Sequence, residues 1–196
     1  LGTQLLAKGH HFPKVTCVGI LDADSLLMSP DFRGEERLAQ LLTQVGGRAG
    51  RAQQPGEVIV QTRHPEHPIM TAVLEKNWRA LSAQLLLSRK AQGLPPNGAL
   101  AALRCDSANA ESGAAFLLAI MEKYRRTTPN AAIRLVGPLS APMARRAGLY
   151  RSHIVITGPK RSEVHASVKI LVTLASEHRL PTGLRWFVDI DPSEPL

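Results

Sequence analysis

The sequence predicts an α/β protein in two parts: a parallel βαβ unit, then a small α+β domain of split βαβ type, with the order β-α-β-β-α-β. Three observations predict it. An unbroken apolar run opens the first part, apolar residues then recur at helical spacing, and strand and helix patterns alternate in the second part. A Gly/Pro-rich segment at residues 93–98 separates the parts, so we expect domains at residues 1–92 and 93–196.

The first part predicts a strand, a helix, a second strand and a further helical stretch. The first strand is a continuous β-branched run, typical of a strand buried on both faces in a parallel sheet. The helix has leucines three and four residues apart, acids in its first turn and a glycine pair, Gly46-Gly47, at its end. The second strand follows Pro55-Gly56. These elements are expected at residues 15–21 (strand), 35–45 (helix), 57–62 (strand) and 69–91 (helix, in one or two pieces).

The second part predicts four strands and two helices. The two helices are expected to cover one face of a four-stranded sheet. Ser162, directly before Glu163, is expected to open the second helix. Residues 137–148 are rich in Pro, Ala and Arg and are expected to form a loop. The strands are expected at residues 98–105, 133–136, 150–157 and 184–190, and the helices at 111–126 and 162–178.

The composition points to an anionic partner. The chain has 24 Lys and Arg against 16 Asp and Glu, a formal net charge of +8, which favours nucleic acid, although an inert basic surface would give the same total. Its two cysteines, Cys17 and Cys105, lie far apart in apolar runs, which indicates buried free thiols rather than a disulfide framework or a zinc cluster. We find neither a membrane-length apolar stretch nor a signal peptide, so we expect a cytoplasmic protein without membrane partners.

The segment QVGGRAGR, residues 44–51, carries the strongest chemical signal. Arg48 and Arg51 follow a helix and stand among glycine and alanine, which let the backbone turn tightly and approach another surface. Guanidinium groups placed in this way suit phosphate oxygens and are typical of an arginine finger, which neutralises charge on a transferred γ-phosphoryl group. The alternative is a glycine-rich helix end with two solvated arginines.

A second basic feature lies later in the chain. Residues 123–162 contain nine Lys and Arg and no Asp or Glu. Arg145, Arg146 and Arg151 lie in or beside the expected loop, where they are predicted to follow a DNA backbone. A solvated basic face is the alternative. Asp22 and Asp24 follow the first strand, where such a pair is more typical of a turn than of a metal site, so we expect no metal in this chain.

Several segments together resemble a known family. They are GTQLLAKGHHFP from Gly2, LDAD from Leu21, the run from DFRGEERLAQLLTQVGGRAGR to HPEHP at residues 31–68, LPP from Leu94, YRSHIVI from Tyr150 and FVDIDP from Phe187. In this order they resemble the replication-restart branch of superfamily 2 DNA helicases, the primosomal protein N′ (replication factor Y) family. The resemblance covers almost the whole chain, and its first 92 residues would be the C-terminal part of helicase lobe 2, with motifs V and VI.

The resemblance implies roles for individual residues. Motif VI would place Gln44, Gly47, Arg48 and Arg51 at an ATP molecule held by the other lobe, with the two arginines as fingers. Motif V would place Thr3 at a DNA phosphate, with Lys8 and His10 nearby. The C-terminal domain would contribute to DNA and partner binding.

The resemblance also implies what this chain lacks. It contains no GxxxxGK[ST] loop and no helicase-type Mg²⁺ motif, so ATP and Mg²⁺ would bind to the parent protein, and this chain alone would be inactive. Zinc would bind to the parent protein outside this chain. The parent protein would unwind DNA in the 3′→5′ direction during replication restart. Its partners would be forked and single-stranded DNA, primosome proteins and single-stranded DNA-binding protein. The alternatives are a non-enzymatic nucleic-acid or partner-binding module, or a piece of another superfamily 2 repair helicase.

Overall fold

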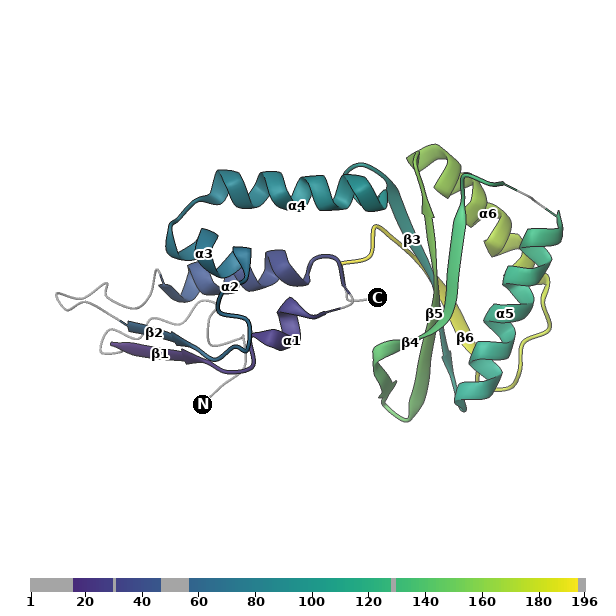
Figure 1. Cartoon of the computed structure of the whole chain (residues 1–196). Coiled ribbons are helices and arrows are strands. Elements are labelled where there is room, and N and C mark those ends of the chain that lie inside the picture. The colour runs from purple at the N-terminus through teal and green to yellow at the C-terminus, as the bar shows by residue number, and fades with distance from the viewer. Residues whose placement is uncertain (1–15, 30, 47–56, 128–129, 194–196) are drawn as a thin grey trace. The chain divides into compact units, whose positions relative to one another are not determined.

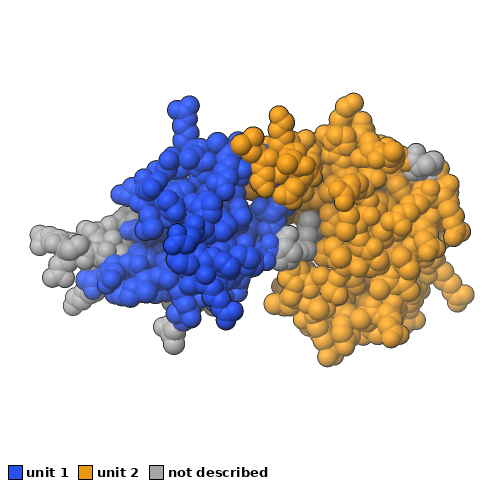
Figure 2. All heavy atoms as spheres, in the orientation of Figure 1, with its two compact units in different colours: residues 1–86 blue, residues 87–196 orange. Residues whose placement is uncertain are grey.

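The computed structural model describes residues 16–29, 31–46, 57–127 and 130–193. Residues 1–86 and 87–196 form two compact units (Figure 2). The division between the two units falls within helix α4 (Trp78–Gln92), after residue 86, six residues before the predicted boundary at residues 92–93.

The first unit contains the predicted parallel βαβ unit. Strand β1 (Cys17–Ile20) pairs in parallel with β2 (Glu57–Val60), with Cys17 opposite Glu57. Between them lie the short helix α1 (Asp24–Leu27) and the amphipathic helix α2 (Gly34–Gly46), and α3 (Pro68–Leu74) follows β2 (Figure 1). The expected leucine face of α2 is confirmed, because its buried apolar side chains join those of α1, α3 and α4 in one core. That core contains Ile20, Ala23, Leu27, Leu38, Ala39, Leu42, Val45, Ile69, Met70 and Leu81.

The prediction that the first strand is buried on both faces is wrong for the described residues. Cys17 and Gly19 are exposed and only Ile20 is buried. In the part of the chain that the structure describes, β1 has one neighbouring strand, so its outer edge and much of its surface stay uncovered. The expectation of two buried thiols therefore fails for Cys17 and holds for Cys105.

The second unit has the predicted β-α-β-β-α-β order. Its elements are β3 (Ala99–Ser107), α5 (Ala110–Thr127), β4 (Arg134–Arg146), β5 (Leu149–Gly158), α6 (Arg161–Glu177) and β6 (Arg185–Ile190). The strands lie in the order β4-β5-β3-β6, and every neighbouring pair is antiparallel. Strand β5 lies between β3 and β4, which makes this the split form of the βαβ unit. Figure 1 shows α5 and α6 on the same face of this sheet, as expected.

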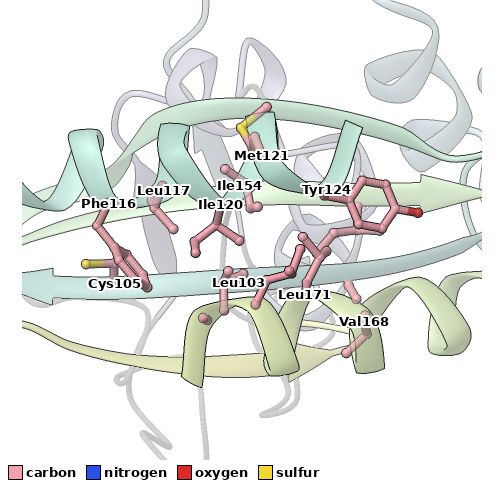
Figure 3. Close-up of a cluster of buried hydrophobic side chains, with 14 of the residues drawn as sticks. Leu103, Cys105, Phe116, Leu117, Ile120, Met121, Tyr124, Ile154, Val168 and Leu171 are labelled. Carbon is pink, nitrogen blue, oxygen red and sulfur yellow. The ribbon is translucent and has the colours of Figure 1, made fainter. Parts of the chain in front are cut away.

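Alternation along the strands builds the core between the sheet and these helices. On β3, Leu103 and Cys105 point to α5 and α6 (Figure 3), and Ala101 joins them in the core. By the alternation of a strand, Arg104 and Asp106 belong to the opposite face. Tyr124 of α5 donates a hydrogen bond of 2.8 Å to Ser167 of α6, so its buried hydroxyl is satisfied. Burial raises the pKa of the Cys105 thiol to about 11, and the neighbouring Asp106 adds to the effect.

The expectation of a loop at residues 137–148 is wrong, because β4 continues to Arg146. Two irregularities accommodate its glycine and prolines, one between Val136 and Leu139 and one between Ser140 and Arg145. Gly137 in the first has φ +132°, and a Cβ there would lie 2.9 Å from the carbonyl oxygen of His153. An edge strand tolerates proline, which lacks the N–H that a central strand needs.

A two-residue turn joins β4 to β5. Ala147 and Gly148 both have positive φ, 50° and 82°, which suits the right-handed twist of a hairpin. Helix α6 begins at Arg161 with Lys160 as its N-cap, so the prediction that Ser162 opens it is also wrong.

Candidate functional site

The end of helix α2 leads to the predicted ATP-facing segment. Gln44 lies in its last turn and is exposed, whereas Val45 beside it is buried in the core of the first unit. The core therefore fixes the orientation of this turn and leaves the Gln44 side chain available to another surface. Gly47, Arg48 and Arg51 lie outside the described residues, as do Thr3, Lys8 and His10 of the first segment.

Two acids lie just beyond the carboxyl end of β1, and both accept hydrogen bonds from nearby residues. Asp24 accepts hydrogen bonds from the Thr62 hydroxyl at 2.5 Å and from the Arg63 backbone N–H at 3.0 Å, which ties the ends of β1 and β2 together. These two hydrogen bonds lower the pKa of Asp24, and the bond from Thr62 has the larger effect. Asp22 accepts a hydrogen bond from the Ser25 hydroxyl. Among the described residues no three His, Cys, Asp or Glu side chains gather as metal ligands.

The β4–β5 hairpin carries the predicted DNA-binding arginines. Arg145 and Arg146 are exposed at the end of β4, on a strand and not in a loop. The Arg145 guanidinium carbon lies 5.3 Å from the centre of the Tyr150 ring, on the strand opposite. This cation–π contact holds Arg145 against the neighbouring strand of its own sheet.

Arg151, the third predicted contact, belongs to an ion network on the sheet face opposite the helices. Its Nε lies 3.9 Å from Asp106 Oδ1. Arg185 of β6 donates from its Nε to Asp106 Oδ2 at 3.0 Å, and its second nitrogen lies 2.9 Å from the same oxygen. Asp106 is buried, with 8% of its surface exposed. It pairs with one arginine from each of β5 and β6, the two strands that flank β3.

The next row of this face has a second pair. Arg104 of β3 is buried and donates to Asp189 of β6 at 3.0 Å. None of these four charged residues is among those predicted from the sequence to bind DNA or ATP. The available signal was the alternation of charged and apolar residues in LRCD of β3.

His153 of β5 lies in the same row as Arg104. It is opposite Arg104 in the register, is 1% exposed, and neither ring nitrogen has a hydrogen-bond partner among the described residues. Burial, together with the positive charges of Arg104 and Arg151, lowers the pKa of His153 to about 4. The imidazole is therefore neutral at pH 7.

This burial predicts a pH-dependent stability. In the unfolded chain His153 takes up a proton at about pH 6.5, whereas the folded protein resists it until about pH 4. The unfolded state then binds more protons in this window, so stability falls as the pH drops from 6.5 to 4, by roughly 3 kcal/mol from this group. Urea titrations of the wild type and of His153→Gln at pH 7 and 4.5 measure the difference, and parallel pH profiles would contradict it.

No helix of the described residues is long and apolar enough to cross a membrane.

The chain is similar to one protein family model and to several known proteins. A family model described as the primosomal protein N C-terminal domain matches residues 90–193. The chain is 37% identical over 194 residues to the replication restart protein PriA of Haemophilus influenzae, covering 99% of the chain and 26% of that protein. It is 36% identical over 193 residues to the protein of this name from Synechocystis sp., covering 98% of the chain and 22% of the relative.

A third relative has a shorter match. The replication restart protein PriA of Bacillus subtilis is 37% identical over 169 residues, which cover 86% of the chain and 21% of the relative. The chain thus spans about a quarter of the length of these relatives. Among solved structures, the de novo designed protein Foldit4 covers 47% of the chain and 96% of its own length, with 11% identity and a TM-score of 0.32, too low to carry an argument.

Proposed function

This chain belongs to the family of the primosomal protein N C-terminal domain, and from that membership we propose that it is the C-terminal part of an ATP-dependent 3′→5′ DNA helicase of replication restart. The match to the Haemophilus influenzae protein, over 99% of the chain, supports this proposal most strongly. It includes the residues before position 90, which the family model leaves out. The parent protein would act in the cytoplasm on forked and single-stranded DNA, with primosome proteins and single-stranded DNA-binding protein as partners.

The first unit would supply one side of the ATPase. The exposed Gln44 and the following Gly47, Arg48 and Arg51 would face ATP and Mg²⁺ held by the other lobe, and Thr3, Lys8 and His10 would face the DNA strand. When bound, ATP supplies the phosphoryl group, and the arginines stabilise the negative charge that develops on it. The chain alone, without a phosphate-binding loop, would not hydrolyse ATP.

The second unit would contact DNA through its β4–β5 hairpin. Arg145 and Arg146 are adjacent and exposed, and no Asp or Glu occurs at residues 123–162. A phosphate backbone approaching this hairpin would meet no carboxylate of β4 or β5. Arg151 is paired with Asp106 in the ion network. We therefore expect its effect on DNA binding to be indirect, through the position of the strand that this pair supports.

The hairpin predicts a change in salt dependence. Each arginine that contacts a phosphate of single-stranded DNA adds about 0.7 to the slope of log affinity against log salt concentration. Replacing Arg145 and Arg146 with glutamine should therefore reduce the slope by about 1.4. Fluorescence anisotropy with a labelled oligonucleotide, at several salt concentrations, measures it.

A matched pair provides the control. Arg125 and Arg126 are also adjacent and exposed, in the last turn of α5. Glutamine at both positions removes the same charge but should change the slope much less. Equal effects of the two double variants would show that only net charge matters, and no effect of either would remove the hairpin as a DNA contact.

A further inference from the structure

Strand β4 carries an outward bulge just before its arginines. Ser140 pairs with Ser152 and Arg145 pairs with Tyr150, so four residues of β4, Ala141 to Ala144, stand opposite the single residue Arg151 of β5. We call residues 141–144 the β4 bulge. Ala141 is buried and anchors its base, whereas the other three residues are exposed.

Met143 is the only large side chain of the β4 bulge, and it is 59% exposed. Its neighbours are Pro142, which stiffens the backbone, and Ala144, which adds almost no bulk beside it. Methionine is unbranched and polarisable, so it adapts to flat aromatic surfaces. The bulge therefore presents one slender apolar side chain on a narrow support.

Positive charge lies directly beside this apolar tip. Arg145 and Arg146 follow the bulge, and the Tyr150 ring limits the freedom of Arg145. Asp106, the acid that pairs with this end of β5, is already engaged by Arg151 and Arg185. This apolar tip is followed by two arginines, and its own strand carries no Asp or Glu. Such a surface complements the stacked bases and the phosphates of DNA.

We propose that the β4 bulge is a wedge for duplex DNA, in which Met143 enters between adjacent base pairs while Arg145 and Arg146 hold the flanking phosphates. This rests on the proposed DNA contact of the same hairpin and names its substrate class, a stacked duplex. Apolar side chains that enter a base step partly unstack it, at a cost of a few kcal/mol that backbone contacts offset. The arginines supply binding, and Met143 supplies the deformation.

Base unstacking can be measured directly with the whole chain. Duplexes carry 2-aminopurine either at an interior step or at the terminal pair, because its fluorescence rises when stacking is lost. We expect wild-type protein to raise the fluorescence of at least one duplex at saturation. Met143→Ala should abolish the rise and keep its affinity for single-stranded DNA within about twofold, because the phosphate contacts remain. Met143→Leu should restore most of it, since leucine also serves as a wedge.

A second methionine provides a matched control. Met28, in the first unit, is 57% exposed, and Met28→Ala should leave the fluorescence unchanged. An interior signal would place the wedge within a duplex and a terminal signal at its end; both support the proposal. A wild-type protein that binds duplex without any rise, or an equal rise with Met143→Ala, would overturn it. In either case, salt dependence that still requires Arg145 and Arg146 would leave the proposed DNA contact standing.

Discussion

Replacing Arg48 and Arg51 with alanine in the full-length parent protein is expected to lower DNA-stimulated ATP turnover by about 10³-fold or more, the usual contribution of an arginine finger. The physical reason is the loss of two guanidinium groups at the charge that develops on the transferred phosphoryl group. Lysine at both positions should recover little, because it keeps the charge but loses the planar pair of donors. Steady-state phosphate release at saturating ATP and DNA measures the effect.

The control must separate chemistry from folding and DNA binding. Arg63 lies at the end of β2, and its side chain is exposed, so Arg63→Ala removes an arginine from the same unit without touching the predicted fingers. Turnover of this variant should stay near that of the wild type. All variants should also retain DNA affinity. Normal turnover in the Arg48/Arg51 double variant would exclude these residues from the ATPase.

Replacing Asp106 with alanine is expected to destabilise the second unit by about 1.5–3 kcal/mol, because it removes a buried carboxylate that accepts a hydrogen bond from Arg185 and pairs with Arg151. Asp106 holds Arg185 at 2.9 Å and lies 3.9 Å from Arg151. Without it, Arg151 and Arg185 lose this carboxylate, and the positive charge near His153 is less well balanced. Urea unfolding followed by tryptophan fluorescence measures the loss.

The chain offers a convenient reporter and a matched control. Its two tryptophans lie in different units, Trp78 in the first and Trp186 in the second, so a Trp78→Phe background reports on the second unit alone. Asp191 forms an ion pair with Arg161 in which both side chains are exposed, and Asp191→Asn should cost less than about 1 kcal/mol. Asparagine also tolerates the positive φ of 50° at this position. Equal losses from the two substitutions would contradict a special role for Asp106.

Periodic patterns in the sequence predicted most of the elements. The α2 leucines, the long apolar helix α5 and the alternation in β5 repeat often enough for neighbouring residues alone to define them. The parallel pairing of β1 with β2, and the two helices on one face of an antiparallel sheet, followed from the order of these elements. The burial of β1 did not follow, because a strand has two buried faces only where neighbouring elements cover them.

Strand β4 shows where local reasoning fails. Gly137, Pro138 and Pro142 are typical of loops, yet they lie in a strand that continues to Arg146. An edge strand needs hydrogen bonds on one side only, and its bulges take up the residues that cannot pair. Whether a strand lies at the edge is a property of the assembled sheet, which the local sequence does not contain.

The ion network shows the same limit for the site. Asp106 and Arg185 are 79 residues apart, and Arg104 and Asp189 are 85 apart. On β3 the charged positions alternate with apolar ones, which identifies a polar sheet face but not the pairs. Only the register of β3 between β5 and β6 brings these residues together.

The affinity of the whole chain for single-stranded DNA, measured from 50 to 200 mM salt, tests the central claim that its basic C-terminal unit contacts a phosphate backbone. With two phosphate contacts at about 0.7 each in the slope, affinity should fall by at least about sevenfold over this range. Binding that is absent at 50 mM salt, or equally strong at both ends of the range, would contradict the account.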